Sequence, residues 1–281
     1  MKDSVQVTPA ITKLDLAVDA PETYVSYKNN TNFPVEVSLS ASNFSSLEDG
    51  WKINFLEPKD AQNYKYSLTS WIHFEKENLN LDPGKEEKVK VFIDKDKLPF
   101  GGHYAAILAK ISATAQNKGQ IVIEPTLSSL LFVRAASGHE QISGELNDFK
   151  VNGNFFVFPE NALVRFKNTG NSETVPHGQI DILDFRNSLV ARGIVNEDSL
   201  FSLPESIRRY DSKIKQFQSI ELPGIYTAHL SMHLDSNQTL VLQKDIKFLS
   251  FGNKNMLEIE GFFIAILIII FFVIRAKKPK K

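Results

Sequence analysis

The residues best suited to chemistry in this chain are its six histidines. His229 and His233 have the i, i+4 spacing that places two zinc ligands on one face of a helix. The segment 226–234 alternates apolar and polar residues, however, which predicts a strand, where residues four apart lie about 13 Å from each other. One ion cannot bridge that distance, so the sequence predicts solvent-facing strand histidines and no metal ligand.

Other patterns that mark catalytic sites are missing from the sequence. His139-Glu140 lacks the second histidine of the zinc-protease helix motif, and there is no Gly-x-Ser-x-Gly turn, Gly-x-Gly-x-x-Gly segment or phosphate-binding loop. Carboxylates are numerous, but no pair stands out by its spacing. We therefore expect a protein that is not an enzyme, with no catalytic residue and no cofactor.

Composition and charge exclude further classes. The chain is 42% hydrophobic and 23% charged, and its 21 Phe and 7 Tyr favour strands of a folded protein. It has no cysteine, so disulfides and thiolate metal sites are impossible. The formal net charge is -1, and the last seven residues hold five cations and no acid, which leaves -6 on the rest. Dispersed cations on an acidic body predict no nucleic-acid partner.

An apolar run near the C-terminus predicts one transmembrane helix over 256–274. The unbroken run, 262–274, would cover about 20 Å of a hydrocarbon core about 30 Å thick, and extension to Met256 gives about 28 Å. A buried core helix or strand is the alternative, but only seven residues follow the run. The expected anchor residues are Phe262, Phe263, Ile264, Ile266, Leu267, Ile268, Ile269, Ile270, Phe271, Phe272, Val273 and Ile274.

The basic tail, 275–281, predicts the orientation of this helix. Short segments rich in Lys and Arg stay in the cytoplasm, so the tail is expected inside and the body outside the cell membrane. Residues 1–7 lack the apolar stretch of a signal peptide, and we expect an export leader that is missing from this sequence. The cations that set the topology are Arg275, Lys277, Lys278, Lys280 and Lys281.

Strand signals recur about every ten residues along the body, and landmarks of the first half return in order in the second. The cluster 28–32 is echoed by 167–171, and Leu81-Asp82-Pro83 is echoed by Leu203-Pro204. The fold expected is all-β, with two tandem immunoglobulin-like sandwiches followed by the helix. The predicted bounds are 1–136 and 144–251 for the domains and 137–143 for a linker.

A third echo predicts two structural corners. Gly102 precedes Tyr104 by two residues in the first half, and Gly224 precedes Tyr226 in the second. A Gly-rich turn lets the chain pass between sheets, and the following tyrosine starts a strand while its hydroxyl bonds back to the turn. We expect this arrangement in both domains.

Several of these segments carry a resemblance to known families. The first half, with Val7-Thr8-Pro9-Ala10, Ser70-Trp71-Ile72 and Pro99-Phe100-Gly101-Gly102-His103-Tyr104, resembles the first domain of bacterial pilus-assembly-chaperone-like and WxL-interacting surface proteins. The second half, with Asn168-Thr169-Gly170-Asn171 and Gly224-Ile225-Tyr226, resembles the partner domain of such membrane-anchored chains. The resemblance implies that one domain binds the cell wall and the other binds a protein.

The leading hypothesis is a single-pass membrane protein of the cell surface that presents two domains to cell-wall or protein partners, as in adhesion, with a partner strand added at an exposed sheet edge. A membrane-tethered chaperone or assembly factor is the alternative; it needs an apolar cleft between the domains with a basic residue such as Arg134. An envelope enzyme would need acids or histidines that converge in one pocket. Trp51 and Trp71 are either core residues or exposed binding platforms.

Overall fold

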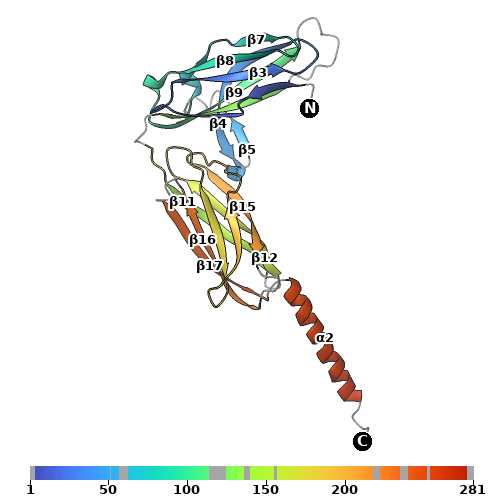
Figure 1. The fold of residues 1–281 in the computed structure, drawn as a ribbon. Coiled ribbons are helices and arrows are strands. Elements are labelled where there is room, and N and C mark those ends of the chain that lie inside the picture. Colours follow the sequence, from blue (N-terminus) through green and yellow to red (C-terminus); the bar gives the residue numbers. More distant parts are fainter. Residues whose placement is uncertain are drawn as a thin grey trace. The chain divides into compact units, whose positions relative to one another are not determined.

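The computed structural model describes residues 4–50, 52–56, 63–113, 125–135, 140–154, 157–217, 222–234, 240–251 and 254–276, and most of them lie in strands (Figure 1). Two compact units divide the chain. The first contains Met1–Ile142, Gly170–Glu173 and Leu203–Ser206, and the second contains Ser143–Thr169, Thr174–Ser202 and Ile207–Lys281. Two short segments of the second half therefore belong to the first unit. The predicted bounds 1–136, 137–143 and 144–251 remain predictions, because 136–139 fall outside the described residues.

The first unit contains two sheets. The four-stranded sheet has the order β1 (Val5–Thr8), β3 (Glu22–Asn29), β8 (Glu86–Ile93), β6 (Ile72–Phe74). The six-stranded sheet has the order β2 (Ile11–Asp15), β10 (Thr126–Ala135), β9 (Gly101–Ala113), β4 (Val35–Leu47), β5 (Lys52–Phe55), and β7 (Asn78–Leu81) also pairs with β4. Short 3-10 turns cover Glu48–Gly50, Thr69–Trp71 and Lys95–Lys97.

Alternating side chains build the core of the first unit. Residues of one parity on β4 and β8 are buried, as the patterns over 35–42 and 88–93 predict. Trp71 packs against this core and is no exposed platform, whereas Trp51 lies outside the described residues. The core includes Val25, Tyr27, Val37, Leu39, Val89, Val91, Ile107, Leu131 and Val133.

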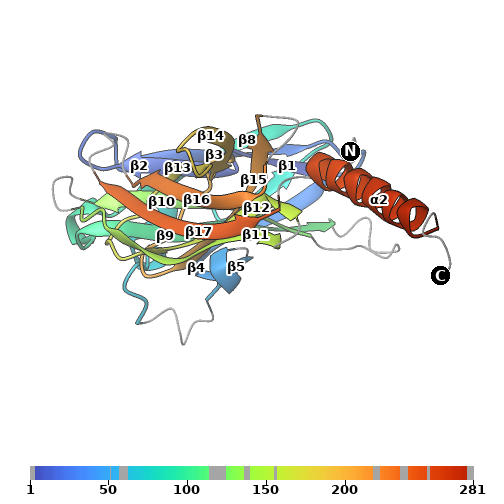
Figure 2. The same cartoon turned by 90° about the horizontal axis from the view of Figure 1, so that it is seen from below.

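The second unit contains seven strands, each hydrogen-bonded to the next in one continuous order. Its order is β11 (Gly144–Asn154), β12 (Val157–Asn168), β15 (Ile207–Gln216), β14 (Leu189–Val195), β13 (His177–Leu183), β16 (Gly224–His233), β17 (Val241–Ser250). β14 and β15 are joined by three residue pairs, whereas β16 and β17 lie side by side over ten (Figure 2). Both units are thus β-structures, which confirms the all-β expectation.

The helix α2 (Lys254–Ala276) contains the predicted anchor. Most of its large apolar side chains between 262 and 272 are exposed, with Phe262 at 66%, and Ile266 is partly buried. In the part of the chain that the structure describes, no helix has both the length and the apolar character needed to cross a membrane. The transmembrane prediction over 256–274 is therefore not confirmed, and Lys277, Lys278, Lys280 and Lys281 lie outside the described residues.

Candidate partner-binding site

The N-terminal chain divides its pairing between the two sheets of the first unit. β1 pairs in antiparallel fashion with Ser26–Asn29 of the four-stranded sheet. After Pro9 and Ala10, β2 pairs in parallel with Leu130–Arg134 of β10 in the six-stranded sheet. One short segment thus covers edges of both sheets, and neither cover is complete.

The consequence is an uncovered half of β10, residues 126–129, which we call the β10 half-edge. On one side these residues pair with β9. The Leu130 N–H donates to the Ala10 carbonyl at 2.9 Å, on the β2 side. Successive residues of a strand point their backbone groups to opposite sides, so the N–H and C=O groups of Thr126 and Ser128 also face away from β9. Among the described residues, no strand pairs with them on that side.

Side chains around the half-edge leave part of the core accessible. Leu127 is half-buried against the core, and Val5 and Val7 of the neighbouring β1 are half-buried in the same way. Thr126 and Ser128 are exposed. An extended segment laid along the half-edge would therefore bond to two residues of backbone and direct alternate side chains onto an apolar margin.

A hydrogen bond closes the half-edge at its β2 end. The Ser129 hydroxyl donates to the Pro9 carbonyl at 2.6 Å, and Ser129 is buried. This bond holds the crossing segment against β10 at the point where β2 begins to pair. The part of β10 that a partner strand could pair with therefore ends before Ser129.

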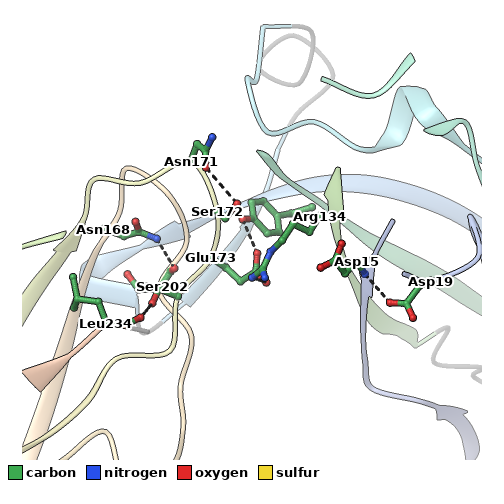
Figure 3. Close-up of polar contacts among 11 residues, drawn as sticks. Asp15, Asp19, Arg134, Asn168, Asn171, Ser172, Glu173, Ser202 and Leu234 are labelled. Atoms are coloured by element: carbon green, nitrogen blue, oxygen red, sulfur yellow. Dashed lines mark hydrogen bonds and ion pairs between the residues drawn. The ribbon is translucent and has the colours of Figure 1, made fainter. Parts of the chain in front are cut away.

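Arg134, the basic residue that the chaperone alternative needs, is already paired inside the first unit. Its Nη2 lies 3.1 Å from Oε1 of Glu173, which is only 7% exposed (Figure 3). The Tyr104 hydroxyl donates to Oε2 of the same carboxylate at 3.1 Å. Burial and the nearby Glu173 charge raise the pKa of Tyr104 well above its usual range. Arg134, which the chaperone alternative expects in an apolar cleft, therefore serves an ion pair inside the first unit.

A second carboxylate, Glu205, receives two donors in the same unit. The Tyr66 hydroxyl and the Lys65 ammonium lie 2.9 and 3.0 Å from its Oε1. These bonds lower the pKa of Glu205, the one from Lys65 most. Neither Glu173 nor Glu205 stands out in the sequence by type or spacing, although each lies within two residues of a repeated landmark, Asn171 or Pro204.

These polar contacts border an aromatic cluster on the outer face of the six-stranded sheet. Tyr104 contacts Phe44, Phe132 and Tyr66, with ring centroids 5.3 to 6.3 Å apart. Phe44, Tyr104 and Phe132 are almost fully buried. Phe44 of β4, Tyr104 of β9 and Phe132 of β10 thus form a second packed layer on this sheet.

The two predicted corners differ in structure. The Tyr226 hydroxyl donates to the carbonyl of Leu222, four residues back, which is the local bond expected of a corner. The Tyr104 hydroxyl reaches Glu173 instead of its own turn. A Cβ on Gly102 would overlap the Tyr104 hydroxyl, whereas one on Gly224 would lie 3.3 Å from Phe185 Cδ1.

The two histidines with the zinc-pair spacing lie on a strand, as the alternation predicts. His229 and His233 belong to β16, and His229 Nδ1 is 2.5 Å from Asp245 on β17. Within the ranges that the structure describes, no three His, Asp or Glu side chains are placed to hold one metal ion. His139 lies outside those ranges.

No protein-family model matches the chain, and no curated protein matches it either. Solved structures of pilus chaperones resemble it. The class 5 fimbriae chaperone CfaA is 8% identical, with a TM-score of 0.45, over 88% of this chain and 99% of that one. A chain of the CsuC–CsuE chaperone and tip subunit complex of Acinetobacter baumannii is 13% identical, with a TM-score of 0.41, over 73% and 89%. The Pseudomonas aeruginosa CupB2 chaperone is 10% identical, with a TM-score of 0.39, over 85% and 98%.

Pilus chaperones are thus among the structural neighbours of the chain. At these identities and TM-scores the likeness assigns neither a function nor a binding residue. The resemblance to WxL-interacting proteins stays a prediction.

Proposed function

We propose that this protein is a non-catalytic assembly factor that binds an extended segment of a surface protein along the β10 half-edge. The single observation that carries the proposal is that β2 pairs with only Leu130–Arg134 of a ten-residue strand. The proposal agrees with the alternative hypothesis of a chaperone or assembly factor. It differs in that Arg134 takes no part in binding. For display to cell-wall partners, the leading hypothesis from the sequence, no binding face is identified among the described residues.

The half-edge offers both affinity and selectivity. Thr126 and Ser128 each present one donor and one acceptor, and each backbone hydrogen bond contributes about 0.5 to 1.5 kcal/mol net. Apolar side chains of the partner that reach Leu127, Val5 and Val7 add burial of about 25 cal/mol per Å². A partner strand that alternates apolar and polar residues gains both terms, and a polar strand gains only the first.

Other edges of the first unit are less suited to this role. β6 has three residues, and β1, β5 and β7 have four each, which limits the backbone bonds that each can make as a whole strand. Short edge strands are a common protection against unwanted pairing. The half-edge belongs to a longer strand that β9 holds along its full length, so it is ordered before a partner arrives.

Photo-crosslinking in the native envelope tests the proposal. A photoreactive amino acid at Ser128 is expected to capture a surface protein, and the same group at Lys88, exposed on the four-stranded sheet, is expected to capture none. The Ser128→Pro change removes the free N–H without removing a bond to β9, so it should abolish capture from position 126; Ser128→Ala should not. Equal capture from 88 and 128, or capture from 126 that survives Ser128→Pro, would contradict the proposal.

We propose separately that α2 attaches the protein to a lipid bilayer, with residues 4–251 on the extracytoplasmic side. Its support is a set of exposed apolar side chains on α2 that the described chain does not cover: Phe262, Phe263, Ile264, Leu267, Ile268, Ile269, Ile270, Phe271 and Phe272. The orientation rests on the cations of 275–281, and the export leader remains part of this proposal.

Fractionation tests the attachment, and labelling tests the orientation. The full chain is expected in the membrane fraction after a carbonate wash, and a chain that ends at Phe251 is expected in the wash. The chain has no cysteine, so Lys244→Cys gives a single thiol that an impermeant maleimide should label in intact cells. Release of the full chain by carbonate would refute the attachment, and labelling only after lysis would refute the orientation.

A further inference from the structure

One end of the second unit gathers the termini of five strands. The register places the last residue of β13, Leu183, opposite Thr227 near the start of β16. Gly224 at the start of β16 lies opposite Ser250 at the end of β17. β14 begins and β15 ends at this same end, because Ala191 pairs with Gln216. The chain passes from here into α2.

Large apolar side chains crowd this end, although strand ends and turns are usually polar. Phe185 is 61% exposed and Ile225 is 58% exposed. Ile225 pairs with Leu249 across β16 and β17, and Gly224 lies next to the Phe185 ring. We call this set the apolar end; it comprises Phe185, Leu189, Phe217, Leu222, Ile225, Leu249 and Phe251.

Three cations among the described residues lie beside the apolar end. The Arg186 guanidinium lies 5.2 Å from the centre of the Phe185 ring, and its partner Asp184 is buried. Lys247 is exposed two residues before Leu249, and Lys215 is exposed two residues before Phe217. Asp245, the next acid along β17, contacts His229. Aromatic and aliphatic side chains with adjacent cations suit the headgroup region of an anionic bilayer.

The path of the chain limits where the apolar end can be. Phe251 precedes Lys254, the first residue of α2, by three residues, which span at most about 10 Å. If α2 enters a bilayer, the apolar end therefore lies close to its surface, where exposed Phe, Leu and Ile side chains are stabilised by partition into the interface.

We propose that the apolar end of the second unit rests in the headgroup region of an anionic bilayer, so that this unit is docked on the membrane and does not swing on its tether. The inference rests on the proposed attachment of α2. It adds a second contact with lipid, made by the β-body itself. The probe chosen to test it is a phosphatidylcholine and phosphatidylglycerol vesicle.

Depth-dependent quenching tests this contact in the full chain. Ile225→Cys and Ser231→Cys, six residues apart on the same face of β16, give single thiols about 20 Å apart for an environment-sensitive dye. In vesicles with spin-labelled lipid, the dye at 225 is expected to lose at least half of its emission. The dye at 231 is expected to lose less than a tenth.

The controls separate the two proposals. Flotation of the protein with the vesicles reports the attachment of α2, and its failure would overturn both the attachment and the docking. Flotation with equal quenching at 225 and 231 would overturn the docking alone. In the undyed Ile225→Cys variant, a disulfide that joins two copies in vesicles at low protein density would assign the apolar end to self-association and would also overturn the docking.

Neutralising two cations beside the apolar end tests whether anionic lipid contributes to the docking. Arg186→Gln with Lys247→Gln should reduce quenching at 225 several-fold in anionic vesicles and should not change flotation. Unchanged quenching would refute the contribution of anionic lipid.

Discussion

Tyr104 and Tyr226 occupy the same position in the repeated Gly-x-Tyr element, but their hydroxyls bond to different kinds of acceptor. Tyr226 donates to Leu222 and packs against Phe158 and Phe248, so its contacts follow from its own turn and neighbouring strands. Tyr104 donates to Glu173, 69 residues away, beside Arg134. A Gly-x-Tyr element therefore specifies where a strand begins, but the partner of the hydroxyl depends on which distant segment the fold delivers.

The largest effect expected from this difference is that of alanine at the two glycines. A Cβ on Gly102 would displace the Tyr104 ring and with it the bond to Glu173, so Gly102→Ala should destabilise the first unit by about 3 kcal/mol. Gly224→Ala meets only the edge of the exposed Phe185 ring and should cost about 1 kcal/mol or less. Urea unfolding measures both effects.

Tryptophan fluorescence assigns the change to a unit. Both tryptophans, Trp51 and Trp71, fall in the residue range of the first unit, so their emission follows that unit alone. Equal shifts of the tryptophan transition by Gly102→Ala and Gly224→Ala would contradict the comparison.

Removal of the Glu173 carboxylate should have the next largest effect. Glu173→Ala leaves Arg134 without its anion and Tyr104 without its acceptor. Because the Arg134 side chain is about a third exposed, water compensates in part, and we expect a loss of about 2 kcal/mol in the tryptophan transition. Glu160→Ala, at an exposed site of the second unit, is the control and should leave that transition unchanged.

The two hydroxyls can then be compared directly. Tyr104→Phe and Tyr226→Phe each remove one hydrogen bond and should each cost about 1 kcal/mol. In a double-mutant cycle with Glu173→Gln, Tyr104→Phe should be non-additive and Tyr226→Phe additive. Additivity for both would mean that the Tyr104 hydroxyl does not depend on Glu173.

The smallest effect expected is the pH dependence from Glu205. Its pKa is lowered in the folded state by Lys65 and Tyr66, so its contribution to stability is present above the unfolded value of about 4.5 and is lost as the pH falls through the folded value. Glu205 and Lys65 are mostly exposed, so this contribution should be under about 0.5 kcal/mol. Glu205→Gln should make the loss of stability between about pH 6 and 3.5 slightly smaller, and a larger loss in the variant would contradict this sign.

Local patterns predicted several individual strands. The alternation over 226–234 and 35–42 depends only on neighbouring residues, and β16 and β4 bury the expected parity. The apolar run near the C-terminus correctly predicted a helix, although the crossing of a membrane is not confirmed.

Such local patterns could not predict the candidate site. The β10 half-edge exists because the chain changes sheets at Pro9 and Ala10 and meets β10 only at Leu130, and a parallel register between segments about 120 residues apart leaves no local signal. The pairing of Arg134 with Glu173 has the same origin. Non-local registers decide both which edge is free and which cation is occupied.

Amide hydrogen exchange in the complex with the captured surface protein is the most direct test of the β10 half-edge. The Thr126 and Ser128 amides should exchange much more slowly in the complex than in the free protein, while the Leu127 amide, which points towards β9, should be unchanged. Equal exchange of Thr126 and Ser128 with and without the partner would contradict the account.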